Sequence, residues 1–322
     1  MAQLGNSTIE DWTLNPPTHL KDAVNTIIAC LAVLVNGMVI TVMLLRRRVF
    51  SSFTNRLILH QSFIDSIAGV IFFLHLVVIK TKQISVSVEG SMTDQFFCRL
   101  VYSDVMLWCV NITSTYNLVM ISLERFMATC HPVKHRNSSS AAKLKFAVGI
   151  AWAIGFIFGL HIIFMFEPRQ GYCQFIEMET ALKVFEATMV VVIECLMPFT
   201  ILIYTYSRII ITLTKKSAPM NGPQNAVNKA KRNILVTTML IGIMFAVCWT
   251  PLEVLFIYEQ FSGDWSTPLY DPFTTLVACN MFVNPIIYFF KYNHFRSELR
   301  QLIQKLLRRN RVGDGNGNPP TS

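Results

Sequence analysis

Charged residues are scarce in this sequence. Asp, Glu, Lys and Arg make up only 15% of its 322 residues, whereas 52% are apolar. The sequence also lacks a Gly-rich nucleotide-binding loop, a His-Glu-x-x-His metal motif and a Gly-x-Ser-x-Gly nucleophile turn. These absences argue against an enzyme. The first residues have neither the basic flank nor the apolar segment of a cleavable signal peptide, so we expect the first apolar run to direct membrane insertion.

Seven apolar runs are each long enough to cross a bilayer, which takes roughly 20 residues of helix. They lie at about residues 23–45, 57–79, 101–123, 144–166, 184–211, 234–258 and 273–290. The sequence therefore predicts an all-α membrane protein, with a seven-transmembrane helix bundle over residues 23–290 after a polar segment, residues 1–22. Apolar residues at helical spacing predict an amphipathic surface helix over 291–309, and the composition of 310–322 predicts a disordered tail.

Basic residues are unevenly divided between the two sides of the predicted bundle. If the loops after spans one, three and five share a side with the C-terminal segment, that side holds 22 of the 28 Lys and Arg residues. The positive-inside rule then places this side in the cytoplasm and the N-terminus outside the cell. Nucleic-acid binding is not expected, because the positive charge is divided among membrane loops.

Among the eight cysteines, Cys98 and Cys173 lie outside the membrane on the predicted extracellular side. An extracellular location permits oxidation, so we expect these two residues to form a disulfide bond at the top of the third span. On the same side, Asn6-Ser7-Thr8 is a glycosylation sequon, and we expect Asn6 to be modified.

Several polar residues lie within the apolar runs, where they are costly and often mark functional sites. Asp65 lies near the middle of the second span, and Ser114, Asn280 and Asn284 lie in spans three and seven. No Lys or Arg lies at the depth of Asp65. A carboxylate among hydroxyl and amide oxygens suits a small hard cation such as Na⁺. The alternative is a neutral Asp65 in a water-filled hydrogen-bond network.

Three prolines and one acid–base pair indicate where the bundle can move. Pro198, Pro251 and Pro285 lie in consecutive spans, although intramembrane prolines often produce only static kinks. Glu124 and Arg125 are adjacent at the end of the third span. This pair can hold the arginine inward until a partner competes for it, or it can simply anchor the helix at the membrane interface.

In their chain order, these residues resemble the motifs of the rhodopsin-like (class A) G protein-coupled receptors, and in character they are closest to the invertebrate peptide-type receptors. The resemblance runs from about residue 23 to residue 307. Every span carries at least one motif residue: Asn36; Asp65; Cys98 and Glu124-Arg125-Phe126; Trp152; Pro198 and Tyr206; Cys248-Trp249-Thr250-Pro251; and Asn284-Pro285-Ile286-Ile287-Tyr288.

The resemblance implies a multi-pass plasma membrane receptor that binds an extracellular ligand and activates heterotrimeric G proteins in the cytoplasm. It implies that Trp249 forms the floor of the ligand pocket. It assigns an allosteric sodium ion, the one cofactor expected, to Asp65, Ser114, Asn280 and Asn284. It assigns the switch facing the G protein to Glu124, Arg125, Tyr206, Asn284, Pro285 and Tyr288.

The sequence departs from the family pattern in places. Lys231 replaces an acid often found near the start of span six, which leaves Arg125 paired only with Glu124 and predicts raised basal signalling. Cys98 and Arg125 are 27 residues apart, more than is usual in the family. This spacing predicts a bulge or an extra partial turn at the top of span three.

The residues expected around the ligand pocket favour a cationic ligand. Leu107 stands where amine receptors of the family have an Asp, although Asp104, about one turn higher, can substitute for it. Glu194 and Glu253 are expected at pocket depth, with His161 nearby. These carboxylates suit the Arg or Lys side chains of a peptide.

An opsin is not expected, because Ala278 stands where retinal requires a lysine. A secondary transporter would also have polar mid-membrane residues, but transporters commonly carry internal repeats, which we do not find in this sequence. A receptor for a non-peptide small molecule remains open. So does a pocket in which Glu194 and Glu253 are paired with Lys80, His161 or water.

Overall fold

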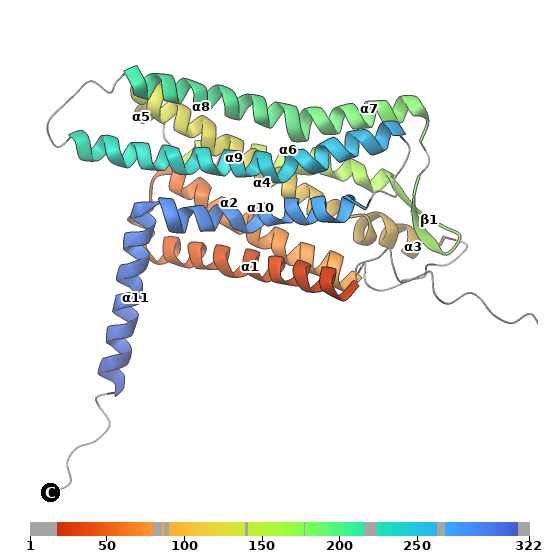
Figure 1. Ribbon diagram of the computed structural model, residues 1–322, viewed down its shortest axis with the longest axis horizontal. Coiled ribbons are helices and arrows are strands. Elements are labelled where there is room, and N and C mark those ends of the chain that lie inside the picture. Colours follow the sequence, from red (N-terminus) through yellow and green to blue (C-terminus); the bar gives the residue numbers. More distant parts are fainter. Residues whose placement is uncertain are drawn as a thin grey trace, which may run out of the picture.

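A computed structural model describes residues 18–79, 86, 90–138, 141–176, 178–215, 224–262 and 268–314 (Figure 1). Among these residues, seven helical segments are long and apolar enough to cross a membrane, which confirms the predicted fold class. They are Leu20–Leu45, Phe53–Ile79, Met92–Cys130, Ala142–Phe164, Thr180–Thr214, Met239–Ser262 and Tyr270–Lys291. Asn6 lies outside the described residues.

Each span consists of one helix or of consecutive helical segments. In chain order these are α1 (Thr18–Leu45); α2 (Phe53–Phe72) with η1 (Phe73–Ile79); α3 (Met92–Phe96), η2 (Phe97–Tyr102) and α4 (Val105–Cys130); α6 (Ala141–Gly159) with η3 (Leu160–Phe164); α7 (Thr180–Val190), η4 (Val191–Leu196) and α8 (Met197–Lys215); α9 (Gln224–Ser262); and α10 (Tyr270–Lys291). The segments η1, η2 and η4 are π-helical and η3 is a 3₁₀ helix.

The two ends of the bundle differ in structure (Figure 1). At one end, called the hairpin end, lies an antiparallel pair of short strands, β1 (Phe166–Arg169) and β2 (Tyr172–Phe175). At the other, called the α11 end, lie α5 (Pro132–Ser138) and α11 (Asn293–Asp314), which runs away from the bundle at a steep angle. The surface helix therefore continues beyond its predicted end at residue 309, and residues 315–322 lie outside the described part.

The central helix of the bundle is α4. Its residues 109–119 are all buried, whereas a helix on the surface of a bundle buries only one face. It packs closely against α6 because two glycines of α6 face it. A Cβ atom added at Gly155 would lie 2.6 Å from the Cys109 carbonyl oxygen, and one at Gly159 would lie 2.8 Å from the Cys109 Cα.

The top of the third span contains the predicted irregularity. The π-helix η2 ends at Tyr102, and Asp104 adopts a left-handed conformation with φ of 62° before α4 begins. A π-helical turn holds more residues than an α-helical turn, so it absorbs the additional length of this span. The disulfide bond between Cys98 in η2 and Cys173 in β2 is present, with 5.3 Å between the Cα atoms. It ties the hairpin to the top of the third span, as predicted.

Candidate functional site

Asp65 is the centre of a buried polar cluster. Its side chain is 1% exposed and accepts three hydrogen bonds. Oδ1 accepts from Ser114 Oγ at 2.8 Å and from Gln61 Nε2 at 3.0 Å, and Oδ2 accepts from Asn284 Nδ2 at 3.0 Å. The structure thus joins spans two, three and seven at the predicted carboxylate. Asn280 is buried nearby in the seventh span, but no hydrogen bond links it to Asp65 among the described residues.

A chain of hydrogen bonds extends this cluster toward α6. Gln61 Oε1 accepts from Asn117 Nδ2 at 2.7 Å. The Asn117 Oδ1 atom lies 2.8 Å from His60 Nδ1, and His60 Nε2 lies 3.0 Å from Trp152 Nε1. Since an indole nitrogen can only donate, His60 Nε2 is the acceptor and the imidazole proton lies on Nδ1. Each member of the chain therefore has a fixed donor and acceptor role, from Trp152 to Asp65.

Glu124 and Arg125 form a second polar cluster, at the α11 end of α4. Arg125 Nε donates to Glu124 Oε2 at 2.8 Å, which is the predicted pair. The carboxylate also accepts from Thr54 Oγ1 in α2 and lies 3.0 Å from His135 Nε2 in α5. Side chains of α4, α2 and α5 therefore contact the Glu124 carboxylate. The sequence predicted only the contact within α4. Lys231 lies in α9, but its side chain is outside the described part of the structure.

The two predicted switch tyrosines belong to the same buried apolar cluster. Tyr206 packs against α9 at Gly242, where an added Cβ would lie 3.0 Å from the tyrosine ring. Tyr288 follows the buried Pro285 in α10 and is 1% exposed. Its hydroxyl group makes no hydrogen bond with any described residue, whereas Tyr292 Oη donates to Asn55 Oδ1 at 2.9 Å.

A cavity of about 310 Å³ lies toward the hairpin end, and we call it the acidic cavity. Five carboxylates are among its described lining residues: Asp104, Glu186, Glu194, Glu253 and Glu259. The lining also includes His161, whose Nε2 lies 3.8 Å from Glu186 Oε1. Asp104 also contacts the imidazole ring of His75 in η1.

Glu194 and Glu253 are the most deeply placed of the carboxylates predicted to bind ligand. They are 7% and 5% exposed, and Glu253 Oε2 makes no hydrogen bond with any described residue. The π-helix η4 carries Glu194 to the cavity wall. A buried carboxylate without a partner is costly, so a site of this kind favours a cation that enters the cavity.

The floor of the acidic cavity differs from the prediction. Trp108 lines the cavity, and Trp249 lies behind it, with ring centroids 5.9 Å apart. Trp249 is 2% exposed and packs on Phe245, so it forms the layer beneath the floor. Leu107 lines a smaller adjoining cavity of about 110 Å³, which shares Asp104 and Trp108 with the acidic cavity.

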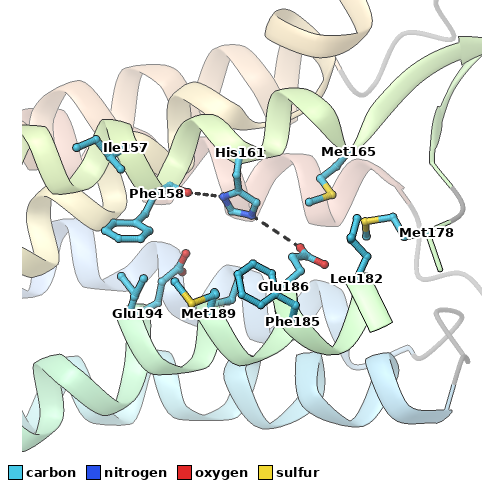
Figure 2. Close-up of a pocket in the computed structure, with 12 residues that line it drawn as sticks. Ile157, Phe158, His161, Met165, Met178, Leu182, Phe185, Glu186, Met189 and Glu194 are labelled. Carbon is cyan, nitrogen blue, oxygen red and sulfur yellow. Dashed lines mark hydrogen bonds and ion pairs between the residues drawn. The ribbon is translucent and has the colours of Figure 1, made fainter. Parts of the chain in front are cut away.

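Another cavity, of about 360 Å³, lies between the η3 end of the fourth span and α7 with η4, and we call it the side cavity (Figure 2). Its wall is mainly apolar and contains Ile157, Phe158, Phe185 and Met189 among others. Figure 2 shows His161 and Glu186 pointing toward each other across this space. Both residues, together with Glu194, line the acidic cavity as well, so the two cavities meet at these side chains.

Comparison with known proteins gives one consistent result. The family model "7 transmembrane receptor (rhodopsin family)" matches residues 35–288. Galanin receptor 2b of Danio rerio is 24% identical over 316 residues, which are 92% of this chain and 78% of that receptor.

Two further relatives match over a shorter stretch. Trace amine-associated receptor 2 of Rattus norvegicus is 27% identical over 221 residues, 64% of each chain. Neuropeptide receptor 22 of Caenorhabditis elegans is 26% identical over 218 residues, 60% of this chain and 50% of that receptor. The chain thus spans less than two thirds of the length of these two relatives. Because the family model covers most of the chain, from the first span to Tyr288, the chain belongs to the rhodopsin family of seven-transmembrane receptors, which are receptors and not enzymes.

Proposed function

We propose that this chain is a G protein-coupled receptor at the plasma membrane for a cationic extracellular ligand, in the first place a peptide with Arg or Lys side chains. The observation that carries this proposal is the acidic cavity, in which five carboxylates converge with a single histidine among the described lining residues. The names of the relatives, a galanin receptor, a neuropeptide receptor and trace amine-associated receptors, support a peptide or amine ligand.

The side cavity favours a peptide over a small amine. A basic side chain can reach Glu194 and Glu253 while a neighbouring apolar side chain occupies the space near Phe185 and Met189. A small amine would use only one of these environments. In addition, Leu107 offers no charge at the position where amine receptors of the family bind their ligand.

We further propose that the hairpin end faces the extracellular side and the α11 end faces the cytoplasm. Basic residues crowd the loops at the α11 end, which the positive-inside rule assigns to the cytoplasm. In this orientation the acidic cavity opens toward an arriving ligand. The Glu124–Arg125 pair lies at the end where a G protein binds.

We also propose that Na⁺ occupies the Asp65 cluster as an allosteric ion. The cluster contains a carboxylate, the Ser114 hydroxyl and the buried Asn284 Oδ1, which has no hydrogen-bond partner among the described residues. These oxygen donors suit a small hard cation. Gln61 and Asn284 also donate to Asp65, so the carboxylate can remain in place without the ion.

The ligand proposal is tested by Glu253→Gln and Glu194→Gln, which keep the side-chain shape and remove the charge. Cells expressing each variant are exposed to a panel of basic peptides and small amines, and second-messenger responses are recorded. We expect the potency of a cationic agonist to fall roughly 10- to 100-fold for each variant, because a hydrogen bond to a charged group contributes about 1.5–3 kcal/mol.

Glu179→Gln provides the matched control. Glu179 precedes α7 at the same end of the bundle, is exposed and does not line either cavity. Its substitution should leave potency unchanged. Equal potency of the wild type, Glu194→Gln and Glu253→Gln toward every active compound would exclude a cationic ligand in the acidic cavity.

A further inference from the structure

Every hydrogen bond on the path from Trp152 to Asp65 has its donor on the Trp152 side. The Trp152 indole donates to His60 Nε2, and His60 Nδ1 donates to Asn117 Oδ1. Asn117 Nδ2 then donates to Gln61 Oε1, and Gln61 Nε2 donates to Asp65 Oδ1. We call these four bonds, which join α6, α2 and α4, the donor chain. Its N–H groups all point toward the carboxylate.

Two groups fix the direction of the donor chain. The Trp152 indole can only donate, so His60 accepts at Nε2 and carries its proton on Nδ1. In the middle of the chain, Asn117 Nδ2 lies 3.2 Å from the backbone carbonyl oxygen of Leu57, which can only accept. Reversing the chain would place two N–H groups against each other at Trp152 and two oxygen atoms against each other at Leu57. Both contacts would leave buried polar groups unsatisfied, which is costly.

The orientation of the Gln61 amide follows from this direction. Asn117 is fully buried and Gln61 is 1% exposed. The Gln61 nitrogen has two acceptors, Asp65 Oδ1 at 3.0 Å and Ser114 Oγ at 2.5 Å. A half-turn of the amide would bring its oxygen to the carboxylate and its nitrogen against Asn117 Nδ2, which is also a donor. The donor chain therefore opposes this rotation.

We propose that Trp152 and His60 are positioning residues for the ion site at Asp65. Through Asn117 they hold the Gln61 nitrogen against the carboxylate and keep the Gln61 oxygen away from it. Breaking the chain at Trp152 or His60 removes one of the two contacts that oppose rotation of the amide. The Gln61 oxygen can then join the carboxylate as a ligand for Na⁺, which prefers oxygen donors.

The donor chain accordingly lowers the affinity of this receptor for sodium. This inference rests on the sodium ion proposed above, whereas the direction of the chain follows from donor and acceptor chemistry alone.

The test measures the sodium concentration that gives half of the maximal stabilisation of the purified receptor. Melting temperatures are recorded in mixtures of sodium chloride and choline chloride at constant total salt. Trp152→Phe and His60→Phe should each lower this midpoint roughly 2- to 10-fold, the equivalent of one hydrogen bond. In a Gln61→Leu background neither substitution should lower it further, because no amide remains to turn. A loss of packing alone would lower the melting temperature in both salts and leave the midpoint in place.

Phe156→Leu provides the matched control on α6. The Phe156 ring packs beside Trp152, with ring centroids 5.8 Å apart, and a phenyl ring has no group that could join the donor chain. Its substitution should leave the sodium midpoint at the wild-type value. Wild-type midpoints in both Trp152→Phe and His60→Phe would overturn the proposal. So would an equal shift in Phe156→Leu, or an undiminished shift in the Gln61→Leu background.

A second measurement separates the donor chain from the ion. In choline chloride alone, Trp152→Phe should lower the melting temperature less in an Asp65→Asn background than in the wild type. The reason is that an asparagine side chain can pair with either orientation of the Gln61 amide. Equal losses in the two backgrounds would overturn the donor chain. If this difference is found but the wild type does not respond to sodium, the ion proposed at Asp65 is rejected and the control of Gln61 by Trp152 is supported.

Discussion

Gln61 supplies one of the hydrogen bonds that stabilise the buried Asp65 carboxylate. Its amide nitrogen donates to Asp65 at 3.0 Å and lies 2.5 Å from Ser114 Oγ, so it occupies lone pairs that a sodium ion would use. Gln61→Leu should therefore have two effects. In choline chloride the receptor should lose about 1–3 kcal/mol of stability, because buried acceptors lose a donor. In sodium chloride the variant should recover part of the lost stability.

The measurement is thermal melting of the purified receptor in equal concentrations of the two salts. The difference between the salts should be larger for Gln61→Leu than for the wild type, and it should disappear in Asp65→Asn. If Asp65→Asn kept the full sodium effect, the ion would bind elsewhere. If Gln61→Leu responded to sodium like the wild type, the amide would not compete with the ion.

Gln61 also illustrates what the sequence could and could not predict about the site. Hydropathy gives the depth of a polar residue in a span but not the direction in which it points. Asp65 and Asn284 were placed correctly because the family motifs identify them, whereas Gln61 carried no motif. Glu186 offered a signal that was missed: it precedes Glu194 by eight residues, close to two helical turns, and therefore lies near the same face.

At the scale of secondary structure, the approach of α6 to α4 depends on two glycines. A methyl group at Gly155 would overlap Thr113 Oγ1 and the Cys109 carbonyl group. Gly155→Ala should force the two helices apart and destabilise the receptor by about 1–3 kcal/mol, the typical effect of overpacking. Thermal melting of the detergent-solubilised receptor measures this loss.

Gly149 provides the control on the same helix. An added Cβ at this position meets no atom within 4 Å. Gly149→Ala should leave stability unchanged or raise it, because alanine favours helix formation by up to about 1 kcal/mol relative to glycine. Equal melting temperatures for the two variants would show that α4 and α6 can separate slightly without loss of stability.

The elements themselves were largely predictable, because span length and hydropathy are local properties. The irregular top of the third span was predicted from the 27 residues between Cys98 and Arg125. Its form was not: neither the π-helix η2 nor the left-handed Asp104 follows from a residue count. The pairing of Asp104 with His75 depends on how η1 and η2 are turned relative to each other, which is a tertiary property.

At the scale of the whole molecule, Tyr288 and Tyr292 lie in adjoining turns of the chain but differ in how they stabilise the bundle. Only Tyr292 has a hydrogen bond with a described residue in the helix arrangement of this structure, whereas Tyr288 needs a shifted arrangement to gain one. Tyr292 stabilises the arrangement seen here through its hydrogen bond to Asn55. Burial raises the pKa of Tyr292, so its hydroxyl group keeps the proton that it donates. The Tyr288 hydroxyl is buried without a described partner, so it contributes nothing to this arrangement. An unpartnered polar group becomes favourable only where the helices shift and supply a partner, for example Tyr206.

Tyr288→Phe and Tyr292→Phe should therefore change stability and signalling in opposite directions. Tyr288→Phe should melt at the same temperature as the wild type or higher, and it should lower basal nucleotide exchange by a purified G protein, because only the shifted arrangement loses a hydrogen bond. Tyr292→Phe should lower stability by about 0.5–1.5 kcal/mol and raise basal exchange. Both are measured without agonist in receptor reconstituted into nanodiscs, where the raised basal signalling expected from Lys231 gives a usable signal. Basal exchange unchanged in Tyr288→Phe would mean that the hydroxyl group has no partner in either arrangement, and the proposed switch would then have to operate without Tyr288.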